Sequence, residues 1–489
     1  MLRPRSSSPS SLPSRRSGCS TYPSQGHHAR YTSKSQILSA SKPNAHNRKS
    51  SQKHHKRQLD YHNAHSASRA SRDSHRGALR GVFSCRNPTT RGGHRRRSPR
   101  PYVRPDLPLS TVRAPWMIAV DIPSCTSIYE LFHQEIVAFE EWISPTPAEK
   151  EVRIFIIETI VKALKVIYPR ATVSAFGSTE TGLYLPSGDI DLVLDLTFMP
   201  ADSDFKLCLR QLAQNLEDLG LAAPGSIEVI ERAQVPIVKF KSVYGLVPID
   251  LSLNQSNGIA GASFFRQFLF DGPNDQLRLM TDEGTLAFRS LVLILKILLE
   301  SRGLEQVFSG GLSSYSVMCL VLSHLQLNPL ARQGRHSSKT FLAALLLELL
   351  DLYGTRLDFN RVSVSVEDGG RLQDQKMRSR GQLIDASIFV EDPVNHVNNI
   401  ARGCFQLEHV KALFNETYAT LESALHLKGS ILDSRREGTS FMLREEYDPE
   451  DLSILSHGLR LPQSLLDARQ RLQEVHKLLK KESKILVTG

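Results

Sequence analysis

The sequence has 489 residues, enough for two or three domains, and 40% of them are hydrophobic. The net charge of +11 is uneven, because residues 1–105 carry 23 Lys and Arg against two acids and the remainder has a net charge of −10. Six scattered cysteines without zinc-ligand spacing argue against a zinc finger, and no apolar run approaches the roughly 20 residues that cross a bilayer. We therefore expect no membrane contact, and no secretory signal is visible.

Residues 1–110 are rich in Ser, Arg, His and Pro and poor in large apolar side chains. Such a segment cannot bury enough surface to offset its ordering entropy, so we predict a disordered basic arm. Its basic runs at 53–57 and 95–97 would attract RNA phosphates without sequence preference, although a solvated tail or a nuclear import signal explains them equally well. The lack of acids before Asp60 also resembles a mitochondrial presequence, so that location stays open.

Two helices are predicted where the ordered part begins. Ser127 and Glu130 have the spacing of a capping box, and the apolar residues that follow share one helical face, which predicts a helix at 127–143. Thr146 and Glu149 repeat this signal with Pro147 at the first helical position. The second helix should end near residue 168, because a proline follows it.

The period then changes to that of strands. Short β-branched runs predict strands at 172–176, 190–196, 227–230, 236–240 and 247–253. Long apolar helices follow from about 284 to 350, so we predict an α+β protein with a small mixed sheet and a mostly helical second part. The last 27 residues or so form an amphipathic helix, which packs either on its own chain or on a partner.

The strongest chemical signal is a pair of acids in an apolar strand. Asp189 and Asp191 are two residues apart among Ile, Leu and Val, so their side chains project from one face. Two neighbouring carboxylates in an apolar setting repel each other unless a cation lies between them. Magnesium, or manganese in its place, suits such a site because it prefers oxygen ligands and shares them with substrate phosphates.

Two further features complete a possible site. Asp250 is the only charge in the predicted strand 247–253, and beside Asp189 and Asp191 it would complete a site for two metals roughly 4 Å apart. Gly177 and Ser178 form a turn at the end of a strand, and such a turn presents backbone N–H groups and a hydroxyl to a phosphate. Either feature alone is weak, but their order and spacing together predict a catalytic site.

These residues resemble the nucleotidyltransferase superfamily of the polymerase β type, and within it the noncanonical, TRAMP-type poly(A) RNA polymerases. The resemblance runs from about Ile128 to Tyr418. The matching motifs are Phe176-Gly177-Ser178, Leu183-Tyr184-Leu185-Pro186, Gly188-Asp189-Ile190-Asp191, Val235-Pro236-Ile237-Val238-Lys239-Phe240, Asn257-Gly258-Ile259, Gly310-Gly311-Leu312-Ser313-Ser314-Tyr315-Ser316 and Glu391-Asp392-Pro393. The stretch from Phe265 to Glu283 is less familiar and is interpreted as a possible insertion.

The resemblance implies a role for each matching residue. Asp189, Asp191 and Asp250 would hold the metals, with Asp250 also helping to deprotonate the RNA 3′ hydroxyl. The nucleotide would be held by Gly177, Ser178 and Lys296 at its phosphates, by Ser314 at another phosphate contact, by Asn257 at the ribose and by Tyr315 stacked on the base. A snorkelling lysine is the alternative for Lys296, and simple core packing is the alternative for Tyr315.

The resemblance also bears on base choice. The loop after Asp392-Pro393 reads the base in this family, and adenylyl-transferring members carry Asn where uridylyl-transferring members carry His. This chain has Asn398 at that position, which favours ATP. His396 lies two residues away, and in a shifted register it would instead favour UTP. The loop departs from the TRAMP-type pattern at Asn399, Ala401 and Gly403, where Asp, Gly and Ser are usual.

The implied fold has a disordered arm at 1–110, a palm-like nucleotidyltransferase domain at 148–260, a helical domain at 261–425 that includes helix 127–143, and a helical tail at 426–489, with the active site in the cleft between the two domains. The implied reaction adds AMP from ATP to RNA 3′ ends in nuclear RNA surveillance. No RNA-recognition module is visible, so a zinc-knuckle RNA-binding subunit and an RNA helicase would supply RNA capture. The expected location is the nucleus, with the nucleolus or the mitochondrion as alternatives.

Three rival functions stay open at this stage. A terminal uridylyltransferase keeps the chemistry and changes the nucleotide. A small-molecule nucleotidyltransferase keeps the metal site and changes the acceptor. A catalytically inactive scaffold of RNA decay keeps only the fold, although the presence of all three acids argues against it.

Overall fold

The computed structural model describes residues 113–196, 198, 204–233, 235–255, 257–270, 282–332, 338–375, 387–437 and 449–488. The predicted arm at 1–110 lies outside these residues, as does the part of the 265–283 stretch between 271 and 281. Among the described helices, none combines the length and the apolar character that crossing a membrane requires.

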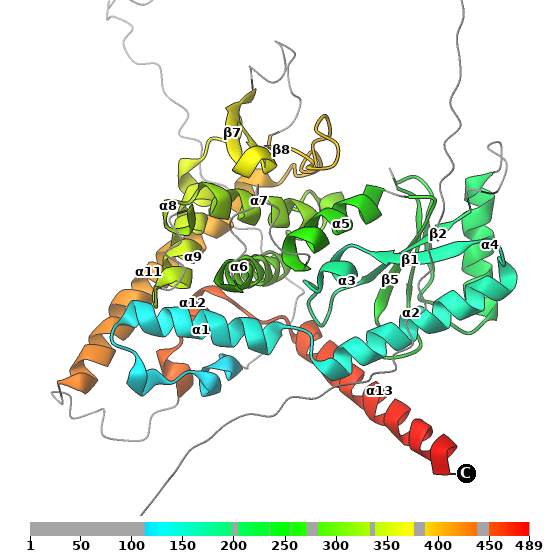
Figure 1. Ribbon diagram of the computed structural model, residues 1–489, viewed down its shortest axis with the longest axis horizontal. Coiled ribbons are helices and arrows are strands. Elements are labelled where there is room, and N and C mark those ends of the chain that lie inside the picture. Colours follow the sequence, from blue (N-terminus) through cyan, green and yellow to red (C-terminus); the bar gives the residue numbers. More distant parts are fainter. Residues whose placement is uncertain are drawn as a thin grey trace, which may run out of the picture. The chain divides into compact units, whose positions relative to one another are not determined.

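A five-stranded mixed sheet forms the first part of the fold (Figure 1). Its strands are β1 (Thr172–Phe176), β2 (Ile190–Asp195), β3 (Glu228–Ile230), β4 (Ile237–Lys241) and β5 (Pro248–Leu253), in the spatial order β1-β2-β5-β4-β3. The β2–β5 pair is parallel and the other pairs are antiparallel. Each strand lies within one residue of the range expected from the sequence, so the prediction of a small mixed sheet is confirmed.

Two helices, α2 (Pro147–Ile167) and α4 (Phe205–Asp218), pack on this sheet. The apolar face of α2 and the inward side chains of β2 and β5 belong to one hydrophobic core, which we call the sheet core. The start of α2 is the predicted capping box: Thr146 Oγ1 accepts from the Glu149 N–H at 3.2 Å, and the Glu149 carboxylate accepts from the Thr146 N–H at 2.7 Å.

A larger helical core follows. Its main helices are α1 (Ile128–Ile143), α6 (Asp282–Glu300), α7 (Ser314–Leu327), α9 (Phe341–Asp351) and α11 (Leu407–Arg436). The early helix α1 packs against α6 and α9, which come far later in the chain. Ser127 caps α1 through the Glu130 N–H as expected, but the Glu130 carboxylate accepts from the Thr126 N–H at 2.7 Å, one residue before the cap.

The remaining elements are shorter or connect these layers. They are the 3₁₀ helices Pro115–Ala119, Ile122–Ser124, Val307–Ser309, η6 (Glu367–Gly369) and Pro449–Leu452, the π-helix Leu352–Arg356, and the α-helices α3 (Ser178–Thr181), α5 (Asn257–Phe270), α8 (Pro329–Arg332), α12 (Leu455–Gly458) and α13 (Gln463–Thr488).

The helical part also carries a three-stranded sheet that the sequence did not predict. Its strands are β6 (Val362–Ser365), β7 (Arg371–Asp374) and β8 (Phe389–Val390), in the order β7-β6-β8. These strands are two to four residues long and β7 is polar, so no period-2 apolar pattern marks them. Beside α7, this sheet positions the loop that contains Asn398.

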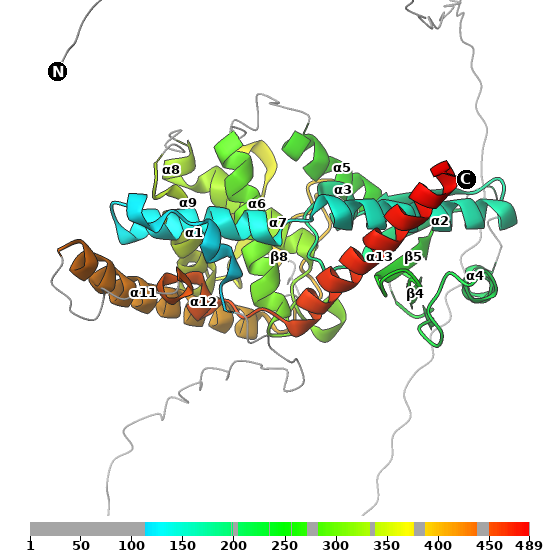
Figure 2. The same cartoon turned by 90° about the horizontal axis from the view of Figure 1, so that it is seen from below.

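The C-terminal helix α13 packs on its own chain, beside α2 (Figure 2). It contacts both cores, because Leu465 is buried in the helical core and Leu472 in the sheet core. Between these two leucines, Arg469 donates to the carbonyl of Trp142 at 2.6 Å and to the buried Glu149 carboxylate at 2.7 Å. Arg469 therefore ties the end of α1 to the start of α2, where the chain passes from one core to the other.

Candidate functional site

The structure brings the three predicted acids together on one face of the five-stranded sheet. Because β2 and β5 are parallel neighbours, their register pairs Asp191 directly with Asp250. Asp189 precedes β2 and shares the face of Asp191. Carboxylate oxygens of the three residues lie within 4.8 Å of one another, and we call this set the acidic triad.

The electrostatics of the acidic triad suit a divalent cation. Burial and the neighbouring charges of Asp189 and Asp250 raise the pKa of Asp191 to about 8. Burial also raises the pKa of Asp250, although Lys239 Nζ lies 2.7 Å from its carboxylate and acts in the opposite direction. Three hard oxygen donors that repel one another in a semi-buried setting fit a magnesium or manganese ion, which would relieve the repulsion.

Lys239 is a part of this site that sequence reasoning missed. It lies on β4, where the antiparallel register pairs it with Asp250. Its only sequence signal was a charge within the apolar run 236–240, in a motif noted for family resemblance alone.

The Gly177-Ser178 turn touches the acidic triad. Gly177 follows β1 with a φ of +63°, and a Cβ atom there would lie 2.5 Å from Asp191 Oδ2. Any side chain would both strain the backbone and collide with the carboxylate, so this position requires glycine. Ser178 then begins the single helical turn α3, which places the backbone of the turn beside the acids.

A buried arginine binds the backbone that precedes the acids of β2. Arg153 on α2 donates to the Gly188 carbonyl at 2.8 and 3.0 Å and to the Asp189 carbonyl at 2.7 Å. Its guanidinium also lies 4.1 Å from the centroid of the Tyr184 ring. The sequence analysis missed Arg153, although a charge on the apolar face of α2 was a visible signal.

Lys296 reaches this site from the helical core. Its ammonium donates to the Leu183 carbonyl at 2.8 Å, and the carboxylates of Asp189 and Asp191 act on it electrostatically, while burial lowers its pKa. The side chain therefore points into the site and does not snorkel to solvent. One turn later, Glu300 accepts from the Ser187 hydroxyl at 2.9 Å, which adds a second link between the two cores.

Tyr315 lies in a separate aromatic group at the start of α7. Its ring meets Phe265 edge to face at a centroid distance of 5.7 Å, and Phe265 stacks on Phe288 at 5.8 Å. Phe265 is fully buried in the helical core, so the described start of the stretch from Phe265 to Glu283 is part of the packed fold; the interpretation of this stretch as an insertion stays a prediction. Ser314 is the first residue of α7 and is half-buried next to Tyr315.

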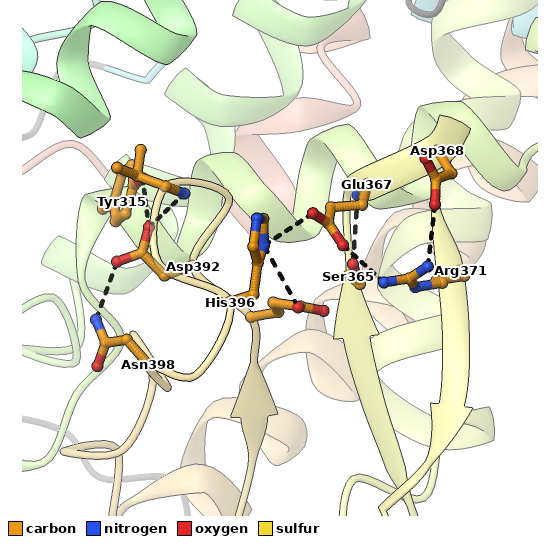
Figure 3. A network of polar contacts seen from close by, with 10 residues as sticks. Tyr315, Ser365, Glu367, Asp368, Arg371, Asp392, His396 and Asn398 are labelled. Atoms are coloured by element: carbon orange, nitrogen blue, oxygen red, sulfur yellow. Dashed lines mark hydrogen bonds and ion pairs between the residues drawn. The ribbon is translucent and has the colours of Figure 1, made fainter. Parts of the chain in front are cut away.

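Asp392 connects Tyr315 to the predicted base-reading residue Asn398 (Figure 3). The Tyr315 hydroxyl donates to Asp392 Oδ1 at 3.2 Å, and Asn398 Nδ2 donates to Asp392 Oδ2 at 2.9 Å. A carboxylate only accepts hydrogen bonds, so the amide nitrogen of Asn398 must face Asp392 and its Oδ1 is presented on the other side. We call Tyr315, Asp392 and Asn398 the base end of the site.

Asn399, where the chain departs from the family pattern, anchors the same loop. Its Oδ1 accepts from the Val390 N–H at 3.1 Å and from the Ala401 N–H at 3.0 Å, and its Nδ2 donates to the Ile388 carbonyl at 2.9 Å. The departure at this position thus satisfies backbone groups at the end of β8 and fixes the loop.

Helix α5 joins the base end to the acidic triad. A Cβ atom on Gly258 would lie 2.5 Å from the Phe176 ring, which precedes the Gly177 turn, and one on Gly261 would lie 2.9 Å from the Tyr315 ring. These two glycines are three residues apart and so share one helical face. Asn257 is the first residue of α5, which places its backbone here; its predicted contact to the ribose stays a prediction.

The comparisons with known proteins agree with this geometry. Residues 132–269 match the family described as "Poly(A) RNA polymerase, mitochondrial-like, central palm domain", and residues 341–398 match the "Cid1 family poly A polymerase". A solved structure described as the polymerase core of TRAMP, an RNA surveillance complex, has a TM-score of 0.58 and 31% sequence identity, and the match covers 71% of this chain and 98% of that one.

Two curated relatives, one of them described as inactive, match most of this chain. Poly(A) RNA polymerase CID14 of Cryptococcus neoformans is 33% identical over 74% of this chain and 46% of its own length. Trf4-2 of Drosophila melanogaster, described as an inactive noncanonical poly(A) RNA polymerase, is 33% identical over 60% of this chain and 68% of its own length. The chain spans about half the length of the curated poly(A) RNA polymerases that it matches in Cryptococcus neoformans, Schizosaccharomyces pombe and Saccharomyces cerevisiae. From the matched palm, the shared helical part and these relatives, the chain belongs to the family of noncanonical poly(A) RNA polymerases.

Proposed function

We propose that this protein is a polynucleotide adenylyltransferase that adds AMP from ATP to RNA 3′ ends without a template. The observation that carries the proposal is the acidic triad, whose carboxylate oxygens lie within 4.8 Å of one another against the Gly177 turn. The family includes an inactive relative, so membership alone does not establish activity. The presence of all three acids in one cluster supports an active enzyme.

The proposed chemistry divides the work between the two cores. Asp189, Asp191 and Asp250 would hold magnesium or manganese, which when bound neutralises phosphate charge and makes the attacking hydroxyl more acidic. Asp250, the carboxylate paired with Lys239, would accept the proton of the RNA 3′ hydroxyl. Catalysis would then rest on positioning, because phosphoryl transfer asks little covalent chemistry of the protein.

The nucleotide would lie between the acidic triad and the base end. The backbone of Gly177 and Ser178 and the ammonium of Lys296 would bind the triphosphate, with Ser314 at the N-terminus of α7 as a further contact. Tyr315 would stack on the base, since Phe265 and Asp392 hold its ring and hydroxyl in place. Pyrophosphate leaves when the new phosphodiester bond forms.

The orientation of Asn398 supports ATP over UTP. Its Oδ1 is an acceptor, and an acceptor pairs with an exocyclic amino group such as that of adenine or cytosine. Uracil and guanine present a carbonyl oxygen at that edge. Two carbonyl oxygens are both acceptors, so no hydrogen bond could form with Asn398 Oδ1. This contact therefore disfavours UTP, and the size and stacking of the purine favour ATP over CTP on Tyr315.

We further propose RNA surveillance as the setting, with a zinc-knuckle RNA-binding subunit and an RNA helicase as partners in a TRAMP-like complex. The 31% identical structural neighbour, described as the polymerase core of such a complex, supports this setting. The proposed location is the nucleus, and the mitochondrion is the alternative. Imaging of the tagged full-length protein beside markers of both compartments distinguishes them.

The direct test supplies each of the four nucleoside triphosphates separately to purified protein and an RNA primer, with and without magnesium. We expect magnesium-dependent extension that is strongest with ATP. A clear preference for UTP would instead identify a terminal uridylyltransferase. Failure to extend RNA with any nucleotide would contradict the proposal and favour a small-molecule transferase or an inactive scaffold.

A further inference from the structure

A second group of metal-ligand side chains lies beside the base end, away from the acidic triad. It consists of Glu367, Glu391 and His396, and one ligand atom from each lies within 4.8 Å of the others. Glu391 follows β8. Glu367 begins η6 in the turn between β6 and β7, and His396 lies in the base-reading loop (Figure 3). We call these three residues the His–Glu cluster.

In the His–Glu cluster, both carboxylates lie near one ring nitrogen of His396. His396 Nδ1 lies 2.8 Å from Glu367 Oε1 and 3.6 Å from Glu391 Oε1. The first distance is a hydrogen bond and the second is too long for one. Ligands about 2.1 Å from a tetrahedral metal ion are about 3.4 Å from one another, which falls between these two separations.

The three-stranded sheet fixes the side chain of Glu367 and the main chain of Glu391. Arg371 Nη2 donates to Glu367 Oε2 at 2.6 Å, which turns the other oxygen of Glu367 toward His396. Glu391 is 3% exposed, and its backbone N–H donates to the Val364 carbonyl at 2.8 Å, which fixes its main chain at the end of β8; the outer hydrogen bond to a ligand carboxylate is the one from Arg371 to Glu367. Ligands fixed in this way by outer hydrogen bonds are typical of metal sites, because the partners set ligand orientation and basicity.

We propose that Glu367, Glu391 and His396 form a zinc site that fastens the base-reading loop to the three-stranded sheet. One imidazole and two carboxylates are a common zinc ligand set, with a water molecule as the fourth ligand. Arg371 also pairs with Asp368, so the carboxylates of Glu367, Asp368 and Glu391 and this one guanidinium leave a net charge of about −2, which a divalent ion would neutralise. Magnesium prefers oxygen ligands, so the His–Glu cluster would select a different ion from the acidic triad.

The site would act on base choice through the loop. His396 is two residues from Asn398, and the Asn398 N–H donates to the Asn395 carbonyl at 2.8 Å, so the loop turns tightly between them. A metal bond to His396 would therefore restrict where Asn398 can place its amide. This consequence for nucleotide selection rests on the proposed function, whereas zinc binding itself does not.

The test measures zinc binding to the purified full-length chain, stripped of metal and held in excess magnesium to occupy the acidic triad. We compare the wild type with His396→Ala and Glu367→Gln, and we use His426→Ala, an exposed histidine on α11, as the matched control. Histidines of the N-terminal arm give the same background in every variant. We expect the wild type and the control to bind one more zinc ion per chain than His396→Ala and Glu367→Gln.

The size of the loss separates ligands from outer partners. We expect Arg371→Met, which removes an outer hydrogen bond, to weaken zinc binding by about 10- to 100-fold, and the two ligand variants to weaken it further. Cobalt in place of zinc should give the visible absorption of a four-coordinate ion in the wild type and lose it in His396→Ala.

Equal zinc stoichiometry in the wild type and His396→Ala, or unchanged cobalt absorption, would overturn the inference and leave a hydrogen-bonded cluster only. Nucleotide incorporation is scored separately on the same preparations. Absent zinc with intact AMP incorporation overturns only this inference, and bound zinc without incorporation overturns only the proposed function.

Discussion

The acidic triad and the His–Glu cluster are two converging sets of ligand atoms on two different sheets. The acidic triad has three carboxylates on neighbouring parallel strands, with burial and mutual repulsion raising the pKa of Asp191 to about 8. The His–Glu cluster mixes an imidazole with two carboxylates, and Arg371 already pairs with one of them. The first set therefore suits a hard ion that works on phosphates, and the second suits a structural ion.

The residues proposed for phosphoryl transfer and those proposed for nucleotide selection also lie in different regions. Apart from Ser314 at the start of α7, the residues that would touch phosphate gather around the five-stranded sheet, and those that would touch the base lie beside the three-stranded sheet. Lys296, Glu300 and helix α5 make contacts that join these two regions. Changes near the acidic triad should alter the rate with every nucleotide, whereas changes at the base end should alter the choice among nucleotides.

The largest effect is expected for Asp191→Asn. We expect AMP incorporation to fall by at least about a thousandfold, or about 4 kcal/mol of transition-state stabilisation, because a metal ligand is lost. The metal-free variant should melt no lower than the wild type, since the substitution removes repulsion within the acidic triad. Asp195→Asn, on the same strand and face, is the control and should retain activity. Undiminished primer extension by Asp191→Asn would remove the acidic triad from the mechanism.

The next effect is expected for Lys296→Met, which keeps the aliphatic stem and removes the ammonium. We expect kcat/KM for ATP and for UTP to fall by a similar factor of about 100, as for other lost electrostatic contacts to a transition state. Lys162→Met, an exposed lysine on α2, serves as the control. A change smaller than about threefold would assign Lys296 to packing alone.

A smaller and more selective effect is expected for Asp392→Asn. The new amide can donate as well as accept, so the amide of Asn398 is free to turn and present its nitrogen to the base. We expect the preference for ATP over UTP to fall about tenfold, which corresponds to one hydrogen bond of about 1.4 kcal/mol. The ratio of the two kcat/KM values measures this, and an unchanged ratio would show that Asp392 does not orient Asn398.

The smallest effect on activity is expected for Glu300→Gln, where the helical core contacts Ser187. This substitution should instead change the stability of the protein. Burial raises the pKa of Glu300 from its ordinary value of 4.5 to about 7, against the hydrogen bond from Ser187. Between these pH values the folded protein keeps a proton that the unfolded chain has released. The contribution of Glu300 to the free energy of unfolding therefore falls as pH rises from 4.5 to 7 and levels off above it.

Glu300→Gln lacks this titration and keeps an oxygen that can accept from Ser187. We expect the variant to exceed the wild type in unfolding free energy by at most about 3 kcal/mol at pH 8, with the difference vanishing toward pH 4.5. Urea denaturation at several pH values measures this. A variant that is less stable than the wild type at pH 8 would show that the carboxylate is stabilising at this contact.

The acidic triad could be predicted because its information is local. Asp189 and Asp191 stand two residues apart in one apolar strand, and Asp250 is the only charge in another, so strand periodicity fixes the face of each side chain. The pattern does not show which strands pair. The sheet order β1-β2-β5, which brings Asp250 beside Asp191, is visible only in the structure.

The parts that could not be predicted depend on contacts between distant segments. Arg153 reaches across 36 residues to the Asp189 carbonyl, and Glu300 across 113 residues to Ser187. The three-stranded sheet has strands too short to show a period, so the His–Glu cluster that it assembles has no motif. Tyr315 and Asn398 were identified through family resemblance, and Asp392 was part of a matching motif, but its role in orienting them is visible only in three dimensions.

The most direct test of the central claim is a crystal structure of the full-length protein with manganese and a non-hydrolysable ATP analogue. We predict an anomalous manganese peak among the carboxylates of Asp189, Asp191 and Asp250, with the analogue's phosphates beside Gly177. Manganese bound elsewhere, or an analogue whose phosphates lie away from these three acids, would contradict the account.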